Sequence, residues 1–296
     1  MTDPVTNPVT DPRLTLLRAP NPSPMTGEGT NTWLLAEGEA VVLIDPGPAL
    51  DAHLRTILAA LAGRPLAAIL VTHAHLDHSA LAPGLAAATG APVLAFGPAG
   101  SGQSALMARL EADGLTGGGE GIDRIFRPDR CLTDGEVLQL GPLQIEALHT
   151  PGHMSNHLCF ACDGLLFSGD LAMGWASSLV SPPDGDMGAY MASLRRLAAR
   201  RWRAMLPGHG APVADAAARL AELIAHREAR EAAVLAALTA GAADAATLAA
   251  AIYHDTPAAL LPAARRNVLA HLLDLADRNL ISAPLPLTAD SIFHRP

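Results

Sequence analysis

The stretch Leu70-Val71-Thr72-His73-Ala74-His75-Leu76-Asp77-His78 places three histidines and an aspartate directly after an apolar run. That run, Ala67–Val71, is short, continuous and rich in aliphatic residues, which predicts a buried strand. If the chain stays extended just beyond it, His73 and His75 are two residues apart and project to the same side. The sequence therefore sets two imidazoles side by side at the end of a strand.

Asp77 and His78 extend this cluster from a second direction. They fall in the turn before an Ala/Leu-rich segment that predicts a helix from about Ser79 to Ala88. Imidazole and carboxylate groups at this spacing are ligands for one divalent metal ion or for two. The alternative, a run of exposed polar loop residues, would suit a lone histidine better than HxHxDH after a strand.

Three later loops each carry one more ligand-type residue beside a glycine, which lets the backbone turn sharply. They are Pro151-Gly152-His153, Gly169-Asp170 and Pro207-Gly208-His209, each after a short apolar run. We expect these loops to meet at one rim of a sheet. There His73, His75 and His153 could hold one ion, Asp77, His78 and His209 a second, and Asp170 could bridge them. Thr72 and Asp45 could accept imidazole N–H groups behind the ligands, or could be turn or cap residues.

The order HxHxDH, PGH, GD and PGHG resembles the metallo-β-lactamase superfamily of hydrolases over roughly residues 14 to 213. The resemblance implies an αββα sandwich, an α/β fold, with a dinuclear zinc site formed by the seven residues just given; Mn²⁺ or Fe is also compatible with such ligands. It further implies a metal-bridging hydroxide as nucleophile, with Asp77 orienting it. His157 matches the last histidine of a PGHxxxH pattern in relatives. It would donate a proton to the substrate or leaving group, or would be a structural histidine.

Three further segments resemble one branch of the superfamily, the β-lactamase-like protein 2 family, whose best-described members are single-strand endoribonucleases. They are residues 19–26, Thr30-Asn31-Thr32 and Ile44-Asp45-Pro46-Gly47. This branch carries a small C-terminal winged-helix-like domain. Only 39 residues separate Asp170 from His209, too few for the inserted domain of the mRNA-cleaving and RNase J-like members.

The chain is expected to divide into a disordered tail at 1–12, a catalytic domain at 13–213 and a mainly helical, winged-helix-like domain at 214–296. The last part predicts helices at 215–239, 244–252 and 256–278, followed by a strand and wing at 280–287. Few arginines lie on the helices that would meet nucleic acid, so we expect this domain to pack on the first or to form a homodimer contact.

Composition limits the function classes. The 296 residues carry a net charge of −9, which gives no global attraction to nucleic acid or to a membrane surface. Aromatic residues make up only 3%, which leaves few side chains for base stacking. Three cysteines make no disulfide framework, and neither a signal peptide nor a membrane-spanning segment is evident. We therefore expect a cytoplasmic protein that does not bind membranes.

A cluster of arginines near residues 195–203 and Tyr190 are the candidates for substrate contact. Arg195 and its neighbours could bind backbone phosphates, although a solvated helix face is the stronger interpretation. Tyr190 begins a helix after the loop 176–188 and could reach the substrate, although packing in the core is favoured.

Three functions stay open. The first is a zinc-dependent phosphodiesterase acting on single-stranded RNA, as the branch resemblance implies; the charge and the few aromatic residues count against it. The second is an ester or thioester hydrolase of small molecules resembling glyoxalase II, whose ligands are the same but whose glutathione-binding pattern is not recognisable here. The third is a non-catalytic nucleic-acid-binding protein, which the complete ligand set argues against.

Overall fold

The computed structural model describes residues 10–117 and 121–295. Most of the predicted tail, residues 1–9, lies outside them. Within the rest of that tail the structure differs from the prediction at Asp11, which is buried and forms ion pairs with Arg13 and Arg203. These contacts fix the chain before the first strand begins.

The first sheet has six strands in the order in which they occur in the chain. They are β1 (Leu14–Arg18), β2 (Asn31–Glu37), β3 (Ala40–Ile44), β4 (Leu66–Leu70), β5 (Val93–Ala95) and β6 (Arg130–Cys131). From β3 onward neighbouring strands are parallel. The end of β4, where the histidine cluster begins, therefore opens at the carboxyl rim of the parallel part.

The second sheet has five strands in the order β11-β10-β9-β8-β7. They are β7 (Val137–Leu140), β8 (Leu143–His149), β9 (Leu158–Cys162), β10 (Leu165–Gly169) and β11 (Ala204–Pro207). The pair β10–β11 is parallel, so both strands end at one rim. Asp170 and His209 follow these two ends.

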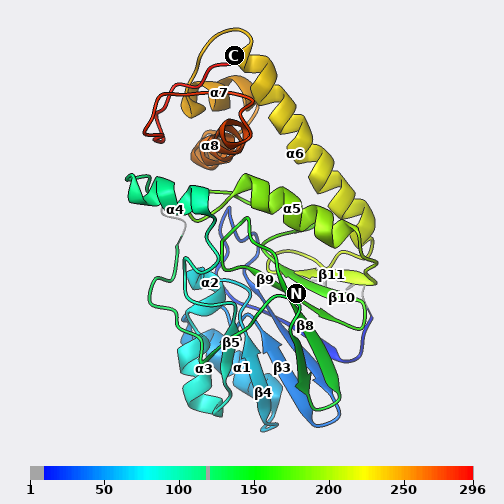
Figure 1. Cartoon of the computed structure of the whole chain (residues 1–296). Coiled ribbons are helices and arrows are strands. Elements are labelled where there is room, and N and C mark those ends of the chain that lie inside the picture. The colour runs from blue at the N-terminus through cyan, green and yellow to red at the C-terminus, as the bar shows by residue number, and fades with distance from the viewer. Residues whose placement is uncertain (1–9, 118–120, 296) are drawn as a thin grey trace.

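The two sheets pack face to face, with helices outside (Figure 1). One buried cluster joins side chains from both sheets, such as Trp33, Val42, Ile145 and Phe160. The outer face of the first sheet is covered by α1 (Asp51–Leu61) and α3 (Ala82–Thr89), and that of the second by α5 (Met187–Ala198) and the first part of α6 (Ala216–Leu238), while the short α2 (Leu76–Ser79) follows the end of β4. This is the predicted αββα sandwich, with two mixed sheets.

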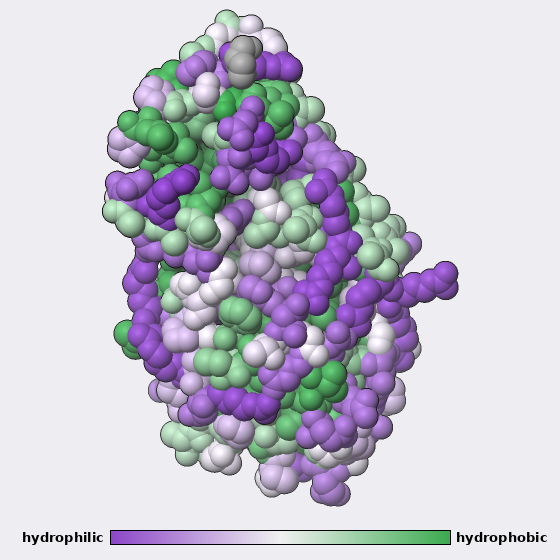
Figure 2. Space-filling model, in the orientation of Figure 1, coloured by the Kyte–Doolittle hydropathy of each residue, from purple (hydrophilic) through white to green (hydrophobic). Residues whose placement is uncertain are grey.

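The C-terminal part is helical and stands at one end of the sandwich, above α4 and α5 in Figure 1. It contains the second half of α6, α7 (Ala245–Ile252), the 3-10 turn η1 (Ala258–Leu260) and α8 (Leu261–Asp277), and its core includes Met107 and Leu110 of α4 (Ala105–Ala112). The strand predicted at 280–287 is absent from the described chain, where only isolated bridges such as Ser282–His294 occur. Apolar residues gather on this end in the view of Figure 2. None of the described helices is long and apolar enough to span a membrane.

Candidate metal centre

Seven side chains from both sheets meet at the rim where β4, β8, β10 and β11 end. They are His73, His75, Asp77, His78, His153, Asp170 and His209. Their ligand atoms lie within 4.8 Å of one another in a first group of His73, His75 and His153, a second group of Asp77, His78 and His209, and a linking group of His73, His78 and Asp170. All seven were expected from the sequence. They come together because each follows a strand whose end lies at this rim.

The first group consists of His73, His75 and His153. Nδ1 of His75 lies 3.0 Å from Nε2 of His73 and 3.1 Å from Nε2 of His153. The backbone beside His153 turns at Gly152, with φ of +147°, and a Cβ there would lie 2.3 Å from the Cα of Tyr190. Only glycine lets this loop pack so closely on α5.

The second group consists of Asp77, His78 and His209. Nε2 of His209 lies 3.2 Å from Oδ2 of Asp77 and 3.3 Å from Nε2 of His78. Thr30 donates its hydroxyl to the same Asp77 oxygen at 3.1 Å. Short α2 begins at Leu76 and turns Asp77 and His78 toward His209, as the sequence predicted for a second direction of approach.

Asp170 lies between the two groups. Its Oδ2 is 3.3 Å from Nε2 of His209 and 3.8 Å from Nε2 of His153, and its Oδ1 is 3.5 Å from Nε2 of His78. Oδ1 is buried and has no hydrogen-bond partner among the described residues. A buried carboxylate oxygen without a partner, surrounded by imidazole nitrogens, is the donor set that a pair of divalent cations would complete. The residues therefore fit a two-metal centre.

Asp45 and Thr72 orient the ligands from behind, as predicted. Asp45 accepts the Thr72 backbone N–H at 2.7 Å, its hydroxyl at 2.8 Å and Nδ1–H of His78 at 2.8 Å. The Thr72 oxygen in turn lies 2.9 Å from Nδ1 of His73 and accepts its N–H. Because Nδ1 of both histidines donates backward, each presents the lone pair of Nε2 to the centre.

The charges differ between the two groups. Burial lowers the pKa of His73 well below its ordinary value, and with neighbouring His153 it lowers the pKa of His75 to about 3. Burial also disfavours the charged forms of His78 and His209, but the nearby carboxylates of Asp77 and Asp170 outweigh this effect. They raise the pKa of His78 well above its ordinary value and the pKa of His209 to about 9. The first group is therefore neutral, whereas protons on the second balance two carboxylates until cations replace them.

His157 does not reach the substrate side of the centre. Its side chain is fully buried, its Nε2 accepts the backbone N–H of Asp170 at 3.2 Å, and its Nδ1 lies 2.9 Å from the Thr150 hydroxyl. Both ring nitrogens are thus engaged, and burial holds its pKa well below the ordinary value. The expectation of a proton donor is replaced by a structural role, since His157 fixes the backbone of Asp170.

Tyr190 and Arg195 do not contact the cavity, and the structure supports the interpretations favoured from the sequence, core packing for Tyr190 and a solvated helix face for Arg195. Tyr190 is fully buried, and its ring packs under the Arg227 guanidinium at 5.2 Å. Arg195 is exposed and pairs with Glu228 at 2.8 Å. Neither lines the cavity at the metal centre.

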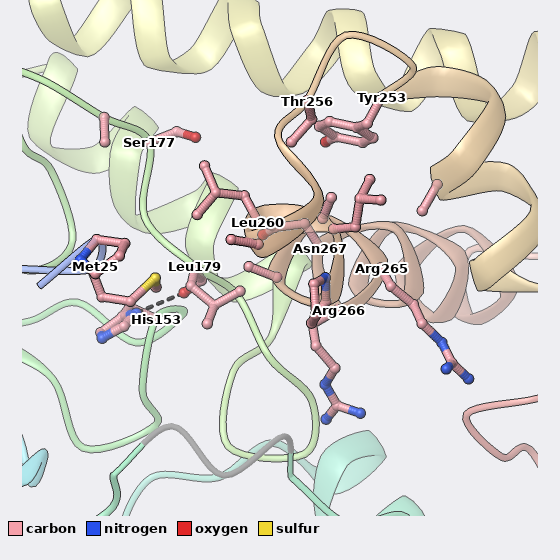
Figure 3. A pocket seen from close by; sticks show the side chains of 18 of the residues that line it. Met25, His153, Ser177, Leu179, Tyr253, Thr256, Leu260, Arg265, Arg266 and Asn267 are labelled. Atoms are coloured by element: carbon pink, nitrogen blue, oxygen red, sulfur yellow. Dashed lines mark hydrogen bonds between the residues drawn. The ribbon is translucent and has the colours of Figure 1, made fainter.

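A cavity of about 1180 Å³ runs from the metal centre to the C-terminal helices (Figure 3). Metal-centre residues line its inner end, and Met25 and His153 lie on one side of the view while Tyr253 and Arg265 lie on the other. Most of the wall is apolar: Met25, Met173, Trp175, Leu179, Ala246, Ala249, Ala250, Leu260, Leu261, Ala264 and Leu269. Sequence reasoning missed these residues, because alanines and leucines on helices carry no signal of a binding site until the fold places them there.

Replacing Asp45 with alanine is expected to weaken metal binding at both groups, because His78 loses its acceptor and Thr72 loses the contact that orients its hydroxyl toward His73. Removing such a group typically costs 10–100-fold in metal affinity or activity, and we expect a loss in that range by isothermal titration calorimetry. Asp129→Ala is the matched control, since Asp129 also accepts a backbone N–H, that of Val93 at 2.8 Å, but contacts no ligand. Equal affinity in the two variants would contradict the role assigned to Asp45.

Comparison with known proteins bears on both parts of the chain. Residues 25–209 match the family model described as "Metallo-beta-lactamase superfamily", and residues 245–283 match "Beta-lactamase associated winged helix domain". The first match covers the sandwich from β2 to β11 and all seven ligands. The second covers α7, η1 and α8.

Relatives and solved structures agree with these matches. "Lactamase-like protein aptB" of Emericella nidulans is 31% identical over 217 residues, 71% of this chain and 60% of that protein, and "Lactamase-like protein nscB" of Trichophyton rubrum is 32% identical over 223 residues, 74% and 61%. The chain thus spans about 60% of these curated relatives. A metallo-beta-lactamase family protein from Thermus thermophilus has 28% identity and a TM-score of 0.75, with 96% of this chain and 99% of that chain covered. A beta-lactamase domain protein from Burkholderia ambifaria, at 24% identity, shares the fold with a TM-score of 0.80 over 100% and 95% of the two chains.

Proposed function

Because this chain belongs to the metallo-β-lactamase superfamily and is a metal-dependent hydrolase of that family, we propose that it cleaves an ester or thioester with a large apolar acyl group. The observation that carries this proposal is the apolar cavity of about 1180 Å³ that is continuous with the metal centre. A phosphodiester backbone would bring a row of charged groups into this space. An acyl chain matches its wall.

The small side chains of α7 and of the α8 N-terminus create the room for such a chain. Ala246, Ala249 and Ala250 of α7 line the cavity together with Leu260 of η1 and Leu261 of α8. Each methylene group moved from water onto an apolar wall gains about 0.8 kcal/mol, which corresponds to about fourfold in affinity. Affinity is therefore expected to rise with acyl length until the cavity is filled.

The inner end of the cavity is where the scissile group would lie. There His75, Asp77, His153, Asp170 and His209 line the wall. Bound metal ions would supply Lewis acidity for the carbonyl oxygen and would lower the pKa of water. The chain itself orients this site, since Thr30 holds Asp77 and Asp45 holds His78.

The arginines that could have contacted phosphates are engaged in ion pairs elsewhere. Arg195, Arg196 and Arg200 form exposed ion pairs with Glu228, Asp134 and Glu146 at 2.8, 2.8 and 2.7 Å. These pairs favour the solvated-face interpretation over RNA binding. Cleavage of single-stranded RNA stays a prediction, as do zinc as the native metal and a homodimer, and the assay below includes RNA.

The proposal predicts a dependence on acyl length that one wall substitution removes. With zinc-loaded protein and acyl thioesters of about two to twelve carbons, we expect KM to fall by about fourfold for each methylene that gains the wall. Ala250→Trp adds a bulky ring to the cavity wall and should raise KM for long-chain thioesters while leaving KM for the acetyl thioester unchanged. The matched control is Ala251→Trp, since Ala251 is the next residue of α7, is also exposed and does not line the cavity.

Two outcomes would contradict the proposal. One is a KM that does not depend on acyl length or that is raised equally by both tryptophan substitutions. The other is metal-dependent cleavage of single-stranded RNA without thioester turnover, which would instead support the endoribonuclease prediction. A variant lacking both His73 and Asp170 serves as the blank for both substrates.

A further inference from the structure

Two side chains of the C-terminal domain hold the segment 178–180, whose Leu179 contacts the ligand His153. Arg227 of α6 donates to the backbone carbonyl of Ser178 and, at 3.2 Å, to the side-chain oxygen of Asn267 of α8. The same Asn267 oxygen accepts the backbone N–H of Val180 at 3.0 Å. The two side chains therefore form hydrogen bonds with the residues on either side of Leu179.

Leu179 is itself the partner of a ligand. Its carbonyl oxygen accepts Nδ1–H of His153 at 2.6 Å, the bond drawn as a dashed line in Figure 3. This bond fixes the tautomer and ring plane of His153, so that Nε2 faces the first group, 3.1 Å from Nδ1 of His75. The position of one carbonyl thus decides where a ligand atom points.

Burying the Arg227 guanidinium in this position costs free energy that its contacts must offset. Its side chain is only 1% exposed and its guanidinium lies over the Tyr190 ring, yet within the described chain its hydrogen bonds go to neutral oxygens rather than to a carboxylate. Burying a charged group without a counterion carries a large desolvation penalty, whereas an apolar residue of similar size would pack α6 at less cost. An apolar residue could not supply the hydrogen bonds that Arg227 donates to Ser178 and Asn267.

We propose that Arg227 and Asn267 are positioning residues for His153, so that the C-terminal domain completes the three-histidine group of the metal centre. Cleavage chemistry and substrate play no part in this assignment, which stands whether the substrate is a thioester or RNA. It gives the winged-helix-like part a role in metal binding, in addition to forming a wall of the cavity.

The test compares two substitutions of Asn267. Leucine is close in size but has no acceptor, which leaves the Val180 N–H unpaired and removes one of the two contacts that hold the segment 178–180. Aspartate keeps an oxygen acceptor and can pair with Arg227. We expect Asn267→Leu to lower Co²⁺ affinity at the tighter site by up to about 10-fold, the lower end of the range for a group bonded directly to a ligand, because Asn267 acts on His153 through the segment that contains Leu179. We also expect a change in the visible d–d spectrum of bound Co²⁺. Asn267→Asp should restore both.

Arg278→Ala is the matched control. Arg278 also links α8 to α6, through Glu231 at 2.6 Å, but within the described chain it makes no hydrogen bond to the segment 178–180. Its replacement should lower the melting temperature without changing Co²⁺ affinity or spectrum. A wild-type Co²⁺ affinity and spectrum in Asn267→Leu would overturn the proposal, and so would an equal loss in Arg278→Ala, which would indicate general loosening of the domain. Folding of each variant is checked by circular dichroism before titration.

Discussion

Replacing Asp170 with alanine is expected to remove nearly all turnover and at least one of the two bound metal ions. Asp170 is the only side chain whose oxygens approach ligand nitrogens of both groups within the described chain, at 3.3 Å for His209 and 3.8 Å for His153. Substituting a group behind a ligand typically costs up to about 100-fold, so loss of the shared ligand should exceed that figure. Metal content by mass spectrometry and kcat on an acyl thioester measure the two effects.

A buried aspartate elsewhere in the fold provides the control for Asp170→Ala. Asp11 is also buried and forms ion pairs with Arg13 and Arg203, far from the ligands in the sequence. Asp11→Ala should lower stability but leave metal content and kcat near those of the parent protein. If Asp170→Ala kept two equivalents of metal and its turnover, the bridging role would be refuted.

Adding a single methyl group at Gly208 is expected to lower turnover by about 100-fold, the order of effect that a misplacement of about 1 Å can cause. A Cβ at this position would lie 2.5 Å from Oδ1 of Asp170 and 2.6 Å from Cε1 of His78. The backbone cannot easily move away. The Gly208 N–H donates to Gly169 at 2.9 Å, and its carbonyl accepts from Asn31 at 2.7 Å. The ligands must therefore shift.

Gly84→Ala tests the same chemical change where there is room. Gly84 lies in α3, and the nearest atom to its added Cβ, Cδ1 of Leu81, is 3.9 Å away. Alanine within a helix should raise stability by roughly 0.5–1 kcal/mol and leave kcat unchanged. The comparison is made by kcat, metal content and thermal unfolding. Wild-type turnover in Gly208→Ala would show that the ligands tolerate displacement.

The seven ligands could be predicted from the sequence because the information is local, whereas the sandwich was implied by the resemblance to the family. Each ligand sits shortly beyond an apolar strand, and parallel strand ends meet at one rim. The apolar pattern of residues 51–61 likewise predicts a helix, and α1 spans these residues, Asp51–Leu61. By contrast, the helix expected from Ser79 to Ala88 is divided between the end of α2 and α3, since α3 begins at Ala82 with Leu81 as its N-cap and Pro83 in its first turn.

What the sequence did not predict depends on contacts between distant segments. The cavity wall joins Met25, Trp175 and Leu260, which lie far apart in the chain, and no pattern marks them. His157 matches a family motif, but only the structure shows that its ring faces the backbone of Asp170. Likewise, the sequence shows that the arginines are clustered but not which residues pair with them. Their partners, Glu228, Asp134 and Glu146, come from other parts of the chain.

The ligands are divided between the two sheets, and this has a consequence for how the protein resists opening. His73, His75 and His78 follow a strand of the first sheet, whereas His153, Asp170 and His209 follow strands of the second. Metal ions shared by these residues would cross-link the two sheets at one edge of the sandwich, since the sheets could not separate without releasing the ions. A ligand that binds only the folded state adds about 4.1 kcal/mol when present at about 1,000 times its Kd. The same side chains would then set how long the fold persists in a cell that is short of metal.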